Sequence, residues 1–144
     1  MNLENVLIKL KIMKKRNRII YWIATVWLAL GMVSTGIVQL IQMEEEVQMM
    51  EHLGYPVYLL TILGVWKVLG TVAILIPKFP LVKEWAYAGF FFAMSGAVCS
   101  HLAVGDEPIT LFGPLLLVVL TLISWYFRPE ERKTIAVARK ATNK

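Results

Sequence analysis

The residue best suited to chemistry in this sequence is Lys67, which lies near the middle of an apolar run at residues 57–76. A run of this length crosses a bilayer as an α-helix, and a charged side chain at its centre usually faces the protein interior or a wet cavity. Gly64, Gly70 and Thr71 lie three or four positions away, so they share its helix face. The ammonium group is suited to bind a carbonyl or carboxylate of a ligand. The alternative is a structural role, in which it bonds neighbouring helices or snorkels to the surface.

Other polar residues gather toward one end of the same predicted helices. His101 lies about one turn from the end of the third apolar run, and Gln39 lies in the outer part of the first. Together they predict a polar pocket with Lys67 at its floor, with Gln39 and His101 at its mouth, and with aromatic residues such as Trp66 around a lipophilic ligand. Small-molecule sites often lie between the helices of a bundle. The structural alternative is a histidine that is hydrogen-bonded to the adjacent loop and a solvated helix end at the glutamine.

The remaining residue types argue against several classes of function. The four apolar blocks, at residues 19–41, 57–76, 85–104 and 109–127, contain no Asp or Glu, so the carboxylate typical of proton-coupled transport is missing. Only two histidines exist, and His52 falls in an expected loop, so neither a metal site nor a haem site is expected. The lone cysteine, Cys99, excludes an intramolecular disulfide. No catalytic residue is assigned, and a complete active site is not expected.

The elements that must position these residues are four transmembrane helices, at about 19–42, 57–76, 81–104 and 109–127. Because lipid offers the backbone no hydrogen bonds, each apolar block must be helical. Helix one is expected to continue into a short surface helix at residues 44–53. Glu84 lies in the first turns of helix three, where a negative charge is favourable. The short loops predict an all-α, antiparallel up-down-up-down bundle.

The charges predict the orientation of this bundle. The 15 basic residues, apart from Lys67, lie before residue 19, between the second and third helices, or after the fourth. The other two loops contain no Lys or Arg and carry acidic residues instead. Since basic residues concentrate on the cytoplasmic side, we expect a basic segment at 1–18 and a basic tail at 129–144, both cytoplasmic. The first helix is expected to be uncleaved, with Met1 and Met13 as alternative starts. Anionic lipids account for the basic segments, and no nucleic acid is expected.

Four segments resemble the DoxX-like family of small bacterial membrane proteins. They are HLGYP (52–56), GVWKVLG (64–70), PKFPLVKEWAYAGFFF (77–92) and SHLAVGD (100–106). The resemblance covers about residues 18–128. It implies a four-helix domain of the bacterial inner membrane, and it implies an association with quinone-linked redox complexes without assigning catalytic residues. Lys67, Glu84 and His101 match recurrent positions.

These observations lead to three functional hypotheses. The first is a redox-associated accessory module that binds a quinone-like ligand or a membrane-associated oxidoreductase partner through the outer polar pocket. The second is a structural or assembly subunit without a ligand. The third, disfavoured by the missing carboxylate, is a small-solute transporter. The sequence leaves the oligomeric state open.

Overall fold

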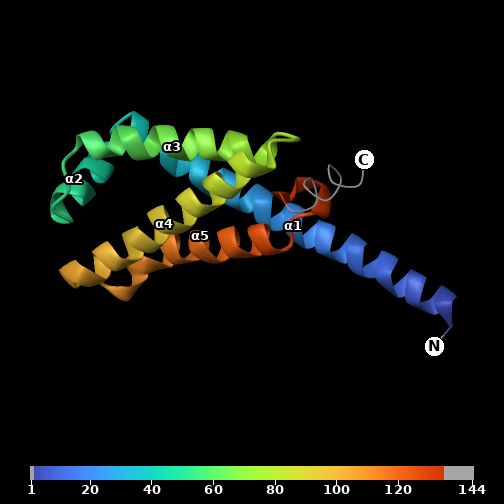
Figure 1. Ribbon diagram of the computed structural model, residues 1–144. Coiled ribbons are helices and arrows are strands. Elements are labelled where there is room, and N and C mark those ends of the chain that lie inside the picture. Colours follow the sequence, from blue (N-terminus) through green and yellow to red (C-terminus); the bar gives the residue numbers. More distant parts are fainter. Residues whose placement is uncertain (1, 135–144) are drawn as a thin grey trace.

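A computed structural model describes residues 2–134 of the chain, and the described part is helical (Figure 1). Its elements are α1 (Leu3–Leu40), α2 (Glu44–His52), α3 (Tyr58–Leu75), α4 (Pro80–Val104), α5 (Pro108–Tyr126) and a final 3-10 turn, η1 (Glu130–Arg132). α2 and the α4–α5 connection lie at one end of the molecule, which we call the acidic end. The α3–α4 connection and η1 lie at the other end, which we call the basic end.

Proline and glycine mark the helix boundaries that position the long helices. Pro80 and Pro108 each occupy the first turn of a helix, where a missing N–H costs nothing. Gly105 ends α4 in a left-handed conformation with φ of 77°, which glycine adopts without strain. The predicted spans therefore agree closely with α3, α4 and α5.

The four long helices pack in a ring, because α1 and α4 each contact both α3 and α5. Their shared core combines aliphatic, aromatic and methionine side chains: Leu28, Met32, Ile74, Tyr87, Phe90, Met94 and Leu117. The closest approach joins α1 to α3. A Cβ atom built on Gly64 would lie 2.8 Å from the carbonyl oxygen of Gly36. Small residues permit such backbone contact between membrane helices.

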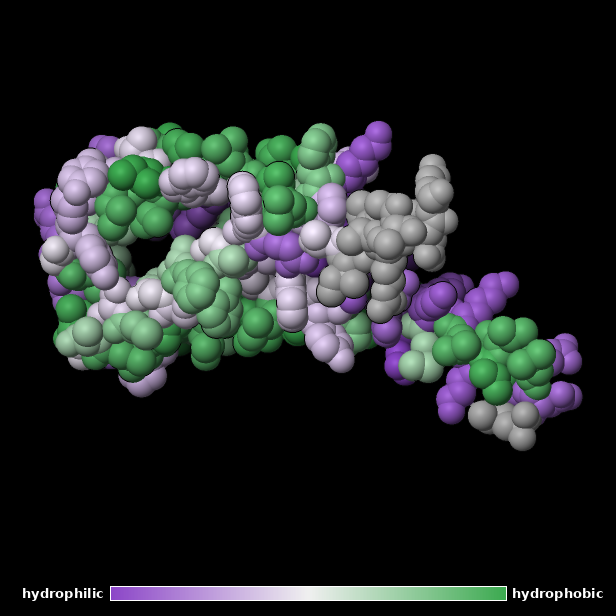
Figure 2. Space-filling model, viewed as in Figure 1, coloured by the Kyte–Doolittle hydropathy of each residue, from purple (hydrophilic) through white to green (hydrophobic). Residues whose placement is uncertain are grey.

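The outside of the bundle is apolar along the helices, as the green and pale surface in Figure 2 shows. Large side chains such as Trp27, Leu69, Phe92 and Phe112 are exposed there. Four helices are long and apolar enough to cross a membrane. A surface of this extent requires an apolar solvent, and the chain is a multi-pass membrane protein that contacts the lipid bilayer.

Two features of the fold differ from the sequence expectation. The described chain has five α-helices rather than four, because α1 ends at Leu40 and α2 is a separate helix. Gln42 has a φ of 50° at the break, and three glutamates at the start of α2 favour a new helix N-terminus there. In addition, α1 runs through the basic segment 1–18 without interruption. The predicted basic tail lies outside the described residues from position 135 onward.

Candidate functional site

Lys67 is buried at the contact between α3 and α1. Its side chain is 6% exposed, and Nζ donates a hydrogen bond of 3.2 Å to Oγ1 of Thr35. The predicted small-residue setting is present, since Gly64 contacts α1 one turn away and Thr71 is buried on the same helix. Thr71 donates to the Lys67 carbonyl at 2.8 Å and therefore stays within its own helix. The ammonium group accordingly faces the protein rather than the surrounding lipid.

Gln39 lies one turn beyond Thr35 on the same face of α1. It is 7% exposed, and Nε2 donates a 3.2 Å hydrogen bond to Oε2 of Glu46 in α2. Its Oε1 atom is buried and accepts no hydrogen bond from residues 2–134. A buried acceptor without a donor is costly. One face of α1 therefore carries Thr35, which accepts a bond from the buried Lys67 amine of α3, and Gln39, whose buried Oε1 is unpaired among residues 2–134.

The acidic half of the bundle contains an opening (Figure 2). In Figure 2 an opening separates α2 and α3, above, from α4, below. The space beside Gly96 of α4 is also open, because a Cβ atom added to it would meet nothing within 4 Å. Gly96 therefore does not pack against a neighbouring helix.

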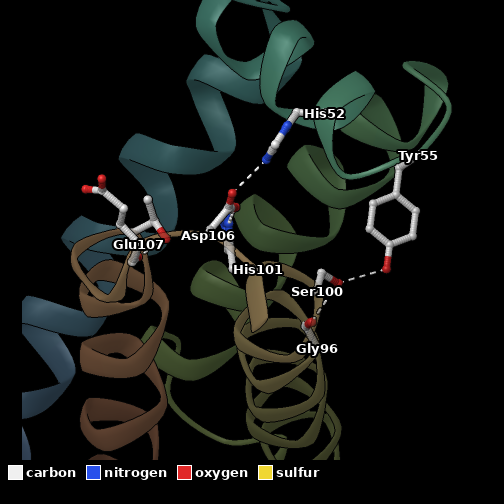
Figure 3. Close-up of polar contacts among 8 residues, drawn as sticks. His52, Tyr55, Gly96, Ser100, His101, Asp106 and Glu107 are labelled. Atoms are coloured by element: carbon white, nitrogen blue, oxygen red, sulfur yellow. Dashed lines mark hydrogen bonds and ion pairs between the residues drawn. The ribbon is translucent and has the colours of Figure 1, made fainter. Parts of the chain in front are cut away.

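Two polar contacts close the acidic end of the molecule (Figure 3). Asp106 accepts hydrogen bonds from His52 at 2.7 Å and from His101 at 2.6 Å, so its carboxylate joins α2 to the end of α4. Tyr55 and Ser100 are hydrogen-bonded at 2.8 Å beside it. His101 thus makes the loop contact named as its structural alternative, and it is buried. The role of His52 could not be predicted from the sequence, because its partner Asp106 lies 54 positions away.

The Asp106 contact makes a pH-dependent contribution to stability. Hydrogen bonds from His101 and then His52 lower the pKa of Asp106 below its ordinary value. A lowered folded-state pKa stabilises the protein above the ordinary Asp value, about 3.9, and the contribution is lost as pH falls through the lowered pKa. We therefore expect Asp106→Asn to lower the thermal unfolding midpoint at neutral pH and to make no difference in strong acid. Glu107→Gln, at the exposed neighbouring position, is the control. A difference that persists unchanged in acid would contradict the assignment.

The basic end is held by charged groups that serve structure. Lys83 is fully buried, and its Nζ donates to the carbonyls of Ala73 at 2.8 Å, Ile74 at 3.3 Å and Ile76, at the end of α3. Such bonds satisfy carbonyls that a helix end leaves free. From the sequence, Lys83 is only one of the positive charges expected between the second and third transmembrane helices. No local sequence pattern indicates that its side chain folds back over the end of α3.

Glu84 links α4 to α5 at the same end. It forms an ion pair with Arg128, and it accepts a 2.9 Å hydrogen bond from Nε1 of Trp125. The guanidinium of Arg128 also lies 5.4 Å from the centre of the Tyr87 ring, a favourable cation–π arrangement. Glu84 therefore joins α4 to the end of α5 at the basic end. Its partners, Trp125 and Arg128, lie far from it in the sequence.

The candidate residues thus fall into separate groups. Lys67 of α3 contacts Thr35 on the face of α1 that also carries Gln39, whereas His101 belongs to the Asp106 contact. Trp66 is 67% exposed and lies on the outer side of α3. Gly70 packs against the ring of Phe90, which a Cβ atom on Gly70 would approach to 2.6 Å.

Comparison with known proteins agrees with this architecture. A family model for the DoxX-like family matches residues 23–124. No curated protein matches the chain, and no solved structure matches it. The matched segment contains α3 and α4, most of the first and fourth predicted spans, Lys67 and the Asp106 partner His101, and it covers more than half of the sequence. The chain belongs to the DoxX-like family.

Proposed function

We propose that this DoxX-like protein binds a quinone-like ligand in the acidic half of its bundle and acts as an accessory module of membrane redox chemistry. The observation that carries the proposal is the presence of a buried donor, Nζ of Lys67, and of a buried acceptor, Oε1 of Gln39, that has no partner among the described residues. Lys67 of α3 bonds to Thr35 of α1, and Gln39 lies one turn beyond Thr35 on the same face of α1. The space-filling view shows an opening in the acidic half of the bundle (Figure 2).

The two groups fit the headgroup of a quinone in both of its oxidation states. A quinone carbonyl accepts a hydrogen bond, which suits the Lys67 ammonium, and a quinol hydroxyl donates one, which suits the Gln39 carbonyl oxygen. The bound quinone would supply two-electron redox chemistry. The chain itself would hold the headgroup, orient it and exclude water. A membrane-associated oxidoreductase is the corresponding partner.

The proposal includes the orientation of the protein in the membrane. We place it in the bacterial inner membrane as an antiparallel bundle with the basic end and both termini in the cytoplasm. The asymmetry of basic residues supports this orientation. The ligand site then lies in the outer half of the membrane.

A structural or assembly role is the second candidate, and one observation favours it. Lys67 already has a partner in Thr35, and the two helices that carry them meet at Gly36 and Gly64. In that case the ammonium group serves only to fix the α1–α3 contact, and no ligand is needed.

The substitution Lys67→Met separates the two candidates. If Lys67 binds the headgroup, the variant should bind a short-chain quinone at least about tenfold more weakly, because it loses one charge-assisted hydrogen bond. Binding is measured by titration of purified protein in nanodiscs. Lys78→Met is the matched control, since Lys78 is exposed in the α3–α4 connection. Unchanged quinone affinity in a folded Lys67→Met protein would leave only the structural role.

A further inference from the structure

A groove of about 380 Å³ runs between α3 and α4 on the outside of the bundle. Lys67 contributes to its lining, and every other lining residue is glycine, alanine, aliphatic or aromatic. Trp66 from α3 and Trp85 from α4 both line it and are largely exposed. The groove therefore has two tryptophan side chains at its rim and one lysine in its lining.

The groove extends from the basic end toward the middle of the bundle. On α4 its lining begins at Val82 and ends at Ala93, which is about 16 Å along the helix axis at 1.5 Å per residue. On α3 the lining runs from Leu63 to Ala73 and includes Lys67. The groove and the proposed headgroup site therefore share Lys67.

The groove keeps its width partly because of Gly89. A Cβ atom added to Gly89 would meet nothing within 4 Å, so the missing side chain leaves open space instead of admitting a neighbouring helix. Gly89 lines the groove in the middle of its α4 wall. Glycine in a helix interior is less favourable than alanine, and helix packing does not account for this one.

We propose that the groove binds the hydrophobic tail of the ligand whose headgroup reaches Lys67. This inference rests on the proposed function and narrows its ligand class to quinones that carry a single long aliphatic or prenyl tail. The groove is continuous with the headgroup site, because Lys67 both lines the apolar groove and donates a hydrogen bond into the bundle interior. A molecule with a polar headgroup and one apolar chain fits a polar site at Lys67 that is joined to an apolar groove. The apolar lining of the groove excludes a charged or sugar-bearing tail.

The test compares two probes with one headgroup, a quinone with a decyl tail and its tail-less parent. Their affinities are measured for the wild type, Gly89→Leu and Gly113→Leu in nanodiscs of one lipid composition. The ratio of the two affinities is compared between proteins, so partition of the tail into the bilayer cancels. Gly113 of α5 is the matched control, because its added Cβ also meets nothing and it does not line the groove. Trp85→Ala is a second variant, which removes part of the rim instead of filling the groove.

The expected result is a decrease of about tenfold in the tail-dependent gain of affinity in Gly89→Leu, with tail-less binding unchanged and Gly113→Leu like the wild type. Trp85→Ala should weaken the same gain. An unchanged affinity ratio in both groove variants would overturn the inference and leave the proposed function standing, since membrane lipid would then occupy the groove. Failure of the wild type to bind either probe would overturn the proposed function and this inference with it.

Discussion

Glu84→Gln should lower the free energy of unfolding by about 3 kcal/mol, because it removes the charge that compensates a buried guanidinium. The side chain of Arg128 is 2% exposed, and that of Glu84 is 33% exposed. The bond from Trp125 can persist to the glutamine oxygen, so the loss measures mainly the uncompensated charge. The measurement is unfolding of purified protein in mixed micelles, followed by helical circular dichroism.

The chain offers a matched control for this prediction in a second arginine–glutamate pair. Arg18 and Glu131 lie 3.4 Å apart, and both side chains are well exposed. Exposed pairs contribute at most about 1 kcal/mol, so Glu131→Gln should have little effect. Replacing the buried pair together, as Glu84→Leu with Arg128→Met, should restore much of the stability. Equal losses for Glu84→Gln and Glu131→Gln would show that the Arg128 pair is not buried.

Gly64→Val should destabilise the bundle by about 3 kcal/mol, the upper part of the range for overpacking. Its Cβ would lie 2.8 Å from the Gly36 carbonyl oxygen and equally close to the side chain of Leu40. Because the first of these is backbone, α1 and α3 must separate. Separation would also lengthen the hydrogen bond between Lys67 and Thr35. Unfolding in mixed micelles reports the loss of stability.

Gly113→Val provides the comparison, because the same side chain there meets open space. It should leave the unfolding free energy within about 0.5 kcal/mol of the wild type, as for an ordinary surface position. If Gly64→Val were equally mild, the close contact between α1 and α3 would be wrong. The position of Lys67 beside Thr35 would then lose its support.

The long helices could be predicted from the sequence because their signals are local. An apolar run fixes the existence of a helix, and Pro80, Pro108 and Gly105 mark boundaries within a residue or two of those observed. The separate α2 was harder to predict. Helical spacing continues from α1 into residues 44–53, and nothing in the composition shows that the chain turns at Gln42.

The polar contacts could be predicted only in part. The small residues around Lys67 indicated a helix contact, since their spacing is local, and the structure gives it Thr35 as a partner. His52, Lys83 and Arg128 were missed as contact-forming residues because their partners depend on how helices fold back on one another. Arg128 lies 44 positions from Glu84 and His52 lies 54 positions from Asp106, while Lys83 bonds to carbonyls seven to ten positions before it, across the α3–α4 connection. Periodicity identifies the face of a helix but not the residue opposite.

The most direct test of the ligand site is photoaffinity labelling of the protein in nanodiscs with an azido-quinone, followed by peptide mapping. The account predicts labelling of α1 near Gln39 and of α3 near Lys67, with suppression of both labels by excess unlabelled quinone. Labelling confined to lipid-facing positions, unaffected by the competitor, would contradict a headgroup site inside the bundle.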